Sequence, residues 1–291
     1  MKKIILVSCF FLSLSASARN LKDIISSGVF YAAVLNPEKD EFDTSKSIEK
    51  NKLINKFFEN YTLRKFNKKI SIKYIYANKF SEFWTNKNGV IIKEDTYSPN
   101  LFKSADAYFE FMSMSDWRVN KATPVSIFKS NLSLVCNFKP DNTDSNLKSI
   151  ALIMKVMYDK TVNFIAIKHT KLDNSLERLK IPQNRIMYVN SRLGLVNGML
   201  QTNKRECTLA ETMLVLNLIT KGKIYFIGQV TPYKNRALAW WIEKNNLELR
   251  DFIQELTSQL KNSAEWDTIF LELFGVKYNL YDFIMRNSDE N

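Results

Sequence analysis

Histidine, cysteine and glycine are all scarce in this chain of 291 residues. The one histidine, His169, excludes a metal site built from several imidazoles. Two of the three cysteines, Cys136 and Cys207, lie beyond the N-terminal region, and their separation is not that of paired metal ligands. In an oxidising compartment these two thiols are able to form a disulfide, but the sequence alone leaves that pairing open. We therefore expect neither a metal centre nor a metal cofactor.

A concentrated nucleic-acid-binding surface is also absent. Lys and Arg outnumber Asp and Glu by 42 to 30, which gives a formal net charge of +12. No block combines clustered basic residues with interleaved aromatic ones, as a nucleic-acid-binding segment would. We interpret the charge as a property spread over the surface, one that favours anionic surroundings and does not indicate a nucleic-acid partner.

The N-terminal residues have the pattern of an export signal. Lys2 and Lys3 precede an apolar run over residues 4–14, and Ala16-Ser17-Ala18 forms a small-x-small cleavage site. We expect residues 1–18 to be removed, which makes the mature protein periplasmic or secreted. A short membrane anchor is the alternative. A lipid anchor at Cys9 is less favoured because the apolar run continues beyond that cysteine.

The remainder of the chain alternates between predicted strands and helices. A short helix ending near Gly28 precedes an apolar strand over residues 29–35, and a long helix over residues 45–68 precedes a second strand over residues 70–76. Such alternation indicates parallel sheets, whose ligands gather at the carboxyl ends of the strands. We expect residues 85–97 to form a surface insertion with a hairpin at Asn88-Gly89.

The most informative segment covers residues 106–128. Residues 107–114 form an apolar run that predicts a buried strand, and Asp116 is a residue type that caps helices. Arg118 then falls in the first helical turn, where its guanidinium group is able to reach the strand end at Ser113. Together with free backbone N–H groups, this set of donors suits a carboxylate. The alternative interpretation is an ordinary strand and turn followed by an exposed arginine.

This segment resembles extracellular solute-binding protein family 3, the bacterial periplasmic receptors for polar amino acids. The family pattern D-A-x-x-x-G-[LM]-[ST]-[IM]-[ST]-x-x-R is matched without a gap by Asp106, Met112, Ser113, Met114, Ser115 and Arg118, although Phe111 replaces the glycine. The resemblance implies a periplasmic-binding-protein type II fold, an α/β architecture of two lobes with mixed sheets joined by two crossover strands. It also implies that Arg118 and Ser113, with the adjoining Met112, hold a ligand carboxylate.

A second segment, residues 203–212, resembles the family pattern G-[KR]-x-D-A-x-x-x-D-E. Glu206 stands at the first acid, and Glu211 stands at the acid that receives the amino group of the ligand. The resemblance adds Thr170, which remains from a G-[ST]-[ST] carboxylate-binding turn, and Phe42, which lies where the family places an aromatic side chain over its ligand. A solvated acid at the start of a helix is the alternative interpretation of Glu211.

The resemblance also implies the domain organisation and the function. We expect lobe one over residues 19–134 and 241–275, lobe two over residues 135–240, and an additional C-terminal tail over residues 276–291. The implied protein is not an enzyme. It captures an amino acid, a similar zwitterion or a short peptide by closure of the two lobes, and it serves an inner-membrane permease of an ABC importer.

Other functions remain open at this stage. The chain is also similar to the binding lobe of membrane-bound murein transglycosylases, which makes sensing of a cell-wall peptide or muropeptide the second hypothesis. An enzyme on the same scaffold, such as a cyclohexadienyl dehydratase, would need an acid in the cleft, and Glu211 is the available residue. A degenerate envelope interaction protein without a small-molecule ligand is a further hypothesis, suggested by Phe111 and the replaced glycines. The sequence does not identify the ligand.

Overall fold

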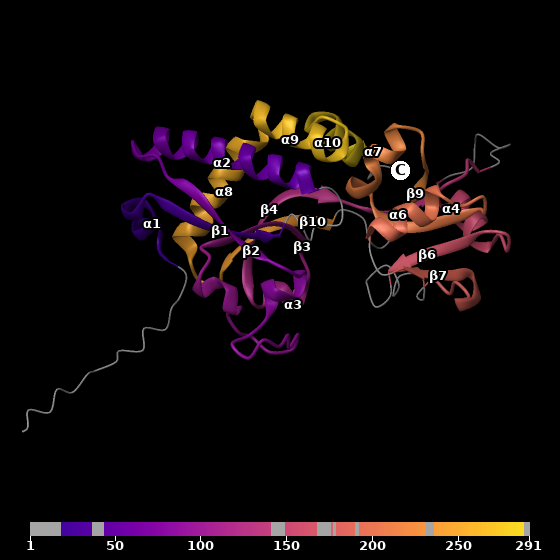
Figure 1. Cartoon of the computed structure of the whole chain (residues 1–291), viewed down its shortest axis with the longest axis horizontal. Helices are drawn as coiled ribbons and strands as arrows, with labels where there is room; N and C mark the ends of the chain where they lie inside the picture. The colour runs from indigo at the N-terminus through magenta and orange to yellow at the C-terminus, as the bar shows by residue number, and fades with distance from the viewer. Residues whose placement is uncertain are drawn as a thin grey trace, which may run out of the picture.

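The chain folds into two α/β lobes, each built around a five-stranded mixed sheet (Figure 1). This computed structural model describes residues 19–36, 44–140, 149–167, 176, 179–189, 192–230 and 236–287. The described part contains no helix that is long and apolar enough to cross a membrane. Within it, no group of three or more His, Cys, Asp or Glu side chains is arranged to hold a metal ion.

The first lobe contains a sheet with the strand order β2-β1-β3-β10-β4. β1, β2 and β3 run parallel, and β10 runs antiparallel to both of its neighbours, β3 and β4. The strands are β1 (Val29–Leu35), β2 (Ser71–Ala77), β3 (Ala107–Ser113), β4 (Ala122–Ser130) and β10 (Arg236–Glu243).

Helices of the first lobe bury a large apolar cluster against one face of this sheet. Figure 1 shows α2, α9 and α10 on that side and α3 on the other side. The helices are α1 (Leu21–Ser27), α2 (Thr44–Phe66), α3 (Asp116–Val119), α8 (Leu247–Lys261), α9 (Ala264–Phe274) and α10 (Tyr278–Asn287), with short 3-10 helices η2 (Phe80–Trp84) and η3 (Asn100–Lys103). The C-terminal tail therefore forms a helix, α10, and its Tyr281 is buried in the core of the first lobe.

The second lobe contains a sheet with the strand order β7-β6-β8-β5-β9. β6, β7 and β8 run parallel, whereas β5 runs antiparallel to β8 and β9. The strands are β5 (Leu132–Cys136), β6 (Asn163–Ile167), β7 (Ile186–Val189), β8 (Glu206–Glu211) and β9 (Tyr225–Gln229); the helices are α4 (Ser149–Tyr158), η4 (Gln183–Arg185), α6 (Arg192–Leu200) and α7 (Thr212–Thr220).

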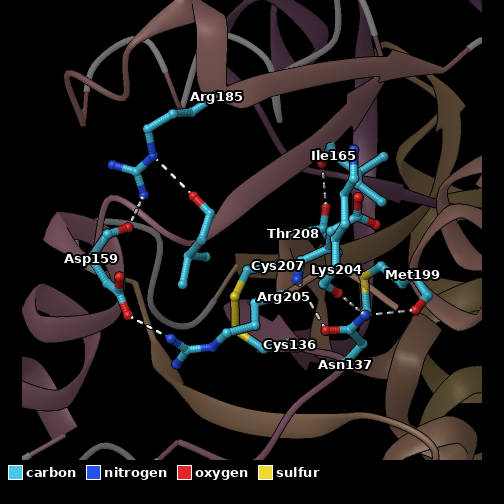
Figure 2. Close-up of a disulfide and its surroundings, with 12 residues drawn as sticks. Cys136, Asn137, Asp159, Ile165, Arg185, Met199, Lys204, Arg205, Cys207 and Thr208 are labelled. Carbon is cyan, nitrogen blue, oxygen red and sulfur yellow. Dashed lines mark hydrogen bonds and ion pairs between the residues drawn. A yellow bond between two sulfur atoms is a disulfide. The ribbon is translucent and has the colours of Figure 1, made fainter. Parts of the chain in front are cut away.

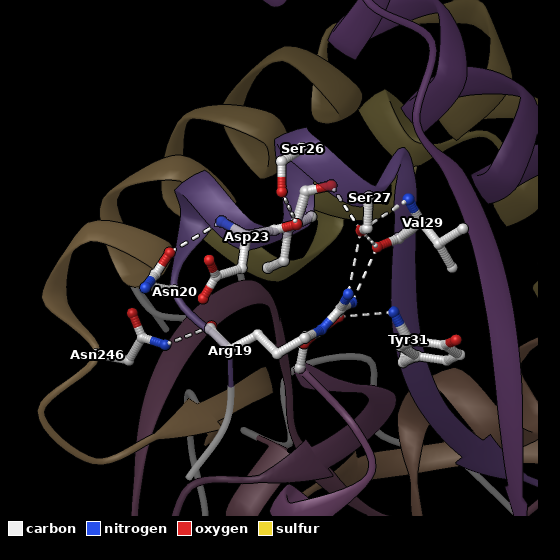
Figure 3. A network of polar contacts seen from close by, with 10 residues as sticks. Arg19, Asn20, Asp23, Ser26, Ser27, Val29, Tyr31 and Asn246 are labelled. Atoms are coloured by element: carbon white, nitrogen blue, oxygen red, sulfur yellow. Dashed lines mark hydrogen bonds and ion pairs between the residues drawn. The ribbon is translucent and has the colours of Figure 1, made fainter. Parts of the chain in front are cut away.

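The first described residues attach the chain to the first sheet by a polar network (Figure 3). The Arg19 guanidinium group donates to both Asp106 carboxylate oxygens, at 3.0 and 2.6 Å, and to the Val29 carbonyl oxygen at 2.8 Å. Asn20 caps α1, and Gly28 ends that helix in the left-handed conformation with φ 69°, a geometry in which glycine avoids the strain of a side chain. The predicted helix, glycine stop and first strand are confirmed.

The chain passes from the first sheet to the second at Asn131, between β4 and β5, and it returns in the segment between Val230 and Arg236. Both passages fall a few residues before the boundaries expected at 135 and 241. Strand pairing sets their positions, since Leu132 pairs with Glu211 in the second sheet and Arg236 pairs with Ser130 in the first. The sequence predicts the apolar strands but does not specify these partners.

Cys136 and Cys207, whose pairing the sequence does not decide, form a disulfide. Cys136 of β5 and Cys207 of β8 are directly paired residues of neighbouring antiparallel strands, and both are fully buried (Figure 2). The bond lies within the core of the second lobe and joins segments that are 71 residues apart.

Candidate ligand-binding site

The best defined polar group at the end of a strand is the pair formed by Ser113 and Arg118. Ser113 is the last residue of β3, α3 begins at Asp116, and Arg118 lies five positions after the serine. Nη1 of Arg118 donates to the Ser113 carbonyl oxygen at 2.8 Å and to its hydroxyl oxygen at 3.2 Å. The local geometry predicted from the sequence is therefore present, and it holds a cation at the carboxyl end of β3.

Two indole rings support the guanidinium group of Arg118. Its central carbon lies 5.1 Å from the ring centre of Trp84 and 5.2 Å from that of Trp117, and the two rings meet edge to face at 5.5 Å. Such contacts attract a cation and restrict its rotamers. Trp84 is fully buried at the end of η2, 34 residues before Arg118, so no local sequence pattern indicates this contact.

The insertion of residues 85–97 contacts the chain just after α3. Lys121, just after α3, is fully buried, and its ammonium group donates to the carbonyl oxygens of Lys93 and Asp95 and lies 4.3 Å from the ring centre of Tyr97. Burial lowers the pKa of Lys121. A tight turn forms at Gly89, but the flanking residues do not pair as strands, so the expected hairpin is present only as a turn.

A buried ion pair that the sequence did not indicate lies near the carboxyl ends of β1 and β3. The Lys50 ammonium group is 3.8 Å from the Glu110 carboxylate, which also accepts a hydrogen bond from the Leu35 backbone at 3.1 Å. Both side chains are almost completely buried. Glu110 belongs to an apolar strand, where the sequence pattern indicates core packing only.

Phe111, which stands at the glycine position of the family pattern, is partly buried and packs against the core of the first lobe. Its ring meets Phe128 at 5.2 Å and Trp266 at 6.2 Å between centres. Met112 faces the opposite cluster and is 3% exposed, so only its backbone is available to a ligand. The structure therefore brings Arg118 and Ser113 together, and it assigns the Met112 side chain to packing.

Glu211 occupies the corresponding position in the second lobe. It is the last residue of β8, and α7 begins at Thr212, whose backbone N–H and hydroxyl group both donate to the Asn131 carbonyl oxygen of the crossover. The Glu211 carboxylate lies near Tyr281 of α10. Burial, with a further contribution from this carboxylate, raises the pKa of Tyr281.

Strand register places Ser113 and Glu211 at the ends of their sheets that adjoin the first crossover. In the first sheet, Ser113 and Phe128 both pair with Leu238 of β10, and Phe128 is three residues before Asn131. In the second sheet, Glu211 pairs with Leu132, the residue directly after Asn131. A cationic group and an acidic group thus belong to different lobes, each at the carboxyl end of a parallel strand. Phe42 and Thr170 lie outside the described residues.

Comparisons with known proteins support the fold. No protein-family model matches the chain, and no curated protein is significantly similar in sequence. Many solved structures do match. The L-cystine solute receptor of Neisseria gonorrhoeae, in an unliganded open conformation, has a TM-score of 0.58 at 14% identity, with 90% of this chain and 98% of that chain covered.

Two further matches have similar coverage. An amino acid ABC transporter substrate-binding protein from Streptococcus pneumoniae, bound to L-arginine, has a TM-score of 0.52 at 14% identity, covering 88% of this chain and 98% of that chain. A binding component of an ABC transporter from Wolinella succinogenes, complexed with lysine, has a TM-score of 0.53 at 11% identity, covering 85% and 96%. The predicted fold class, periplasmic-binding-protein type II, is confirmed.

Proposed function

We propose that this protein is an exported solute receptor that captures an amino acid, or a similar zwitterion, between its two lobes. The observation that carries the proposal is the guanidinium group of Arg118, held at the carboxyl end of β3 by Ser113 and two indole rings. A rigid planar cation with forked N–H donors is suited to bind a carboxylate. The structural neighbours described as binding arginine or lysine support this choice of ligand class.

In this proposal, the carboxylate of Glu211 receives the ammonium group of the ligand. Glu211 terminates a parallel strand of the other lobe, next to the crossover from which both sheets diverge. A ligand that carries both charges contacts both lobes only when they approach each other. It therefore stabilises the closed arrangement by the difference between its contacts in the closed and open states. No covalent step is required.

We further propose that the closed form is the one presented to an inner-membrane ABC permease, and that the protein acts in the periplasm or outside the cell. The buried disulfide supports this location, because structural disulfides persist in oxidising compartments. The expected signal at residues 1–18 lies outside the described residues.

The site is tested by calorimetric titration of the chain from Arg19 onward with a panel of amino acids, short peptides and muropeptides. We expect Arg118→Ala and Glu211→Gln each to weaken binding of the preferred ligand by more than about 100-fold, because loss of one partner leaves a desolvated charge, a cost of about 3 to 5 kcal/mol. Arg64→Ala and Glu248→Gln are the matched controls, since both side chains are exposed on helices of the first lobe.

The same panel separates the alternative functions. A ligand that binds equally well to the two site variants and to the wild-type protein would refute the assignment of Arg118 and Glu211. A muropeptide as the preferred ligand would favour cell-wall sensing. A wild-type protein that no compound of the panel binds or stabilises against heat would support a degenerate interaction protein and reject the receptor.

A further inference from the structure

The positive charge of the protein is concentrated in the second lobe. Residues 132–230 contain fourteen Lys and Arg against seven Asp and Glu, whereas the rest of the chain from Arg19 onward contains 26 against 23. The excess along the sequence therefore falls mainly in the segment that builds the second lobe. A lobe with such an excess attracts anionic surfaces more strongly than the other lobe does.

Part of this charge lies with two exposed aromatic side chains at the end of the second sheet that is farthest from Glu211. We call this end the distal edge and define it by Tyr158, Lys160, Lys204, Lys223 and Tyr225. Strand pairing brings these residues to one end of the sheet, because β5 ends there and β8 and β9 begin there. The start of β6 lies at the same end, since the backbone N–H of Asn163 donates to the carbonyl oxygen of Arg205, the residue before β8. The Tyr158 side chain is 72% exposed and that of Tyr225 is 38% exposed, and the three lysines are exposed.

The arginines at the distal edge are engaged within the lobe (Figure 2). Arg185 donates to three backbone carbonyl oxygens at 2.9, 3.0 and 2.7 Å. Arg205 donates to the Asp159 carboxylate at 2.8 Å and lies 4.2 Å from the ring centre of Phe138. Asp159, the half-buried acid beside Tyr158, is thus paired with Arg205, whose side chain is 40% exposed, and the other exposed cations of this edge are lysines.

Lysine and tyrosine are the residue types that suit a lipid interface. A lysine ammonium group is a strongly hydrated point charge on a long apolar stem, which suits a diffuse layer of phosphate groups. Bidentate recognition of a single phosphate group or base favours the planar fork of arginine instead. Tyrosine places its ring at the level of the headgroups and its hydroxyl group in water. Lysines near an anionic membrane surface each add to the attraction, which salt screens.

We propose that the distal edge docks the second lobe on an anionic phospholipid surface. Glu211 lies at the opposite end of β8, so this contact leaves the candidate ligand-binding end of the sheet exposed to solvent. The proposal does not depend on the identity of any ligand. Binding to vesicles and binding of a zwitterion are therefore measured separately, and either result is independent of the other.

Vesicle co-sedimentation of the chain from Arg19 onward tests the proposal, because this chain lacks the apolar run that would itself bind lipid. We expect binding to phosphatidylcholine vesicles that contain phosphatidylglycerol, and no binding to phosphatidylcholine alone. The triple variant Lys160→Gln, Lys204→Gln, Lys223→Gln should lose about 100-fold in partitioning at about 0.1 M salt, since each lysine near the surface contributes about fivefold.

A matched triple variant, Lys56→Gln, Lys87→Gln, Lys103→Gln, removes the same charge from exposed positions of the first lobe. We expect it to lose less than about fivefold at about 0.1 M salt, because the Debye length is then about 10 Å and these lysines belong to the other lobe. Equal losses in the two triple variants would show that net charge alone drives binding, and would overturn the docking surface. Failure of the wild-type chain to bind anionic vesicles would likewise overturn the proposal, whether or not the chain binds DNA or self-associates.

Fluorescence quenching by brominated phospholipids locates the contact. All five tryptophans belong to the first lobe, so the wild-type chain should show little quenching on anionic vesicles. The variant Tyr158→Trp places an indole ring at the distal edge and should be quenched on the same vesicles. Strong quenching of the wild-type chain, or none in the variant, would mean that another face of the protein contacts the lipid.

Discussion

Reduction of the disulfide between Cys136 and Cys207 should destabilise the second lobe by about 4 kcal/mol. The bond closes a loop of 71 residues, and cross-linking a loop of this length removes chain entropy from the unfolded state equivalent to about 4 kcal/mol at 25 °C. Both sulfur atoms lie in the core of the second lobe, and the bond joins two neighbouring strands of its sheet. Reduction removes the cross-link without removing side-chain atoms, so no cavity term complicates the comparison.

Urea unfolding measures this effect with two signals, one that reports on both lobes and one that reports on the first lobe alone. Far-ultraviolet circular dichroism follows the helices and strands of both lobes, whereas tryptophan fluorescence follows the first lobe, which contains Trp84, Trp117, Trp240, Trp241 and Trp266. With a urea slope of about 2 kcal/mol/M, a loss of about 4 kcal/mol moves the midpoint of the second lobe by about 2 M. We expect an early circular dichroism transition in the reduced protein while the fluorescence transition remains in place.

The variant Cys136→Ala, Cys207→Ala separates the cross-link from the chemistry of the reductant. It should show the same early transition, shifted further by the cavity that the missing sulfur atoms leave. A protein with two titratable thiols and unchanged transitions in both signals would refute the reasoning, because the disulfide would then contribute nothing to folding.

Two further predictions concern buried charges. Arg19→Ala and Asp106→Asn should each lower the free energy of unfolding by about 2 kcal/mol, because hydrogen bonds between charged groups are stronger than those between neutral ones. The double variant should lose less stability than the sum of the two single variants. Strict additivity in this double-mutant cycle would contradict a direct interaction. Burial raises the pKa of Glu206, so the folded state favours the protonated form of this carboxyl group. The resulting contribution to the free energy of unfolding is present below the unfolded pKa of 4.5 and is lost as the pH rises through the raised pKa. Glu206→Gln should therefore raise the melting temperature at neutral pH and have little effect at about pH 4, and an equal effect at both pH values would contradict this assignment.

Features that depend on a few consecutive residues were predictable. Arg118 and Ser113 are only five positions apart, and the apolar strand followed by serine and aspartate predicts both the strand end and the helix start. The stop at Gly28 follows in the same way from the freedom of glycine to adopt positive φ. In each case the interacting groups are close in the chain, so few alternative conformations compete.

Features that join distant segments were not predictable. Trp84 supports Arg118, Lys50 pairs with Glu110, and Cys136 pairs with Cys207, yet none of these pairs has a local signal in the sequence. Each depends on which strands become neighbours. The same is true of the distal edge, whose lysines come from three separate turns and gather only because β6, β8 and β9 start at one end of a sheet.

The amino-acid sequence by itself determined where strands and helices form, and it carried two segments that resemble those of a solute receptor. Only the tertiary structure decided which side chains meet: it paired the cysteines, buried Met112, and packed Phe111 against the core of the first lobe. The physical reason is that local conformation follows from backbone sterics, side-chain periodicity and nearby hydrogen bonds. Contacts between segments dozens of residues apart depend instead on strand order and register, which form only when the whole core is assembled.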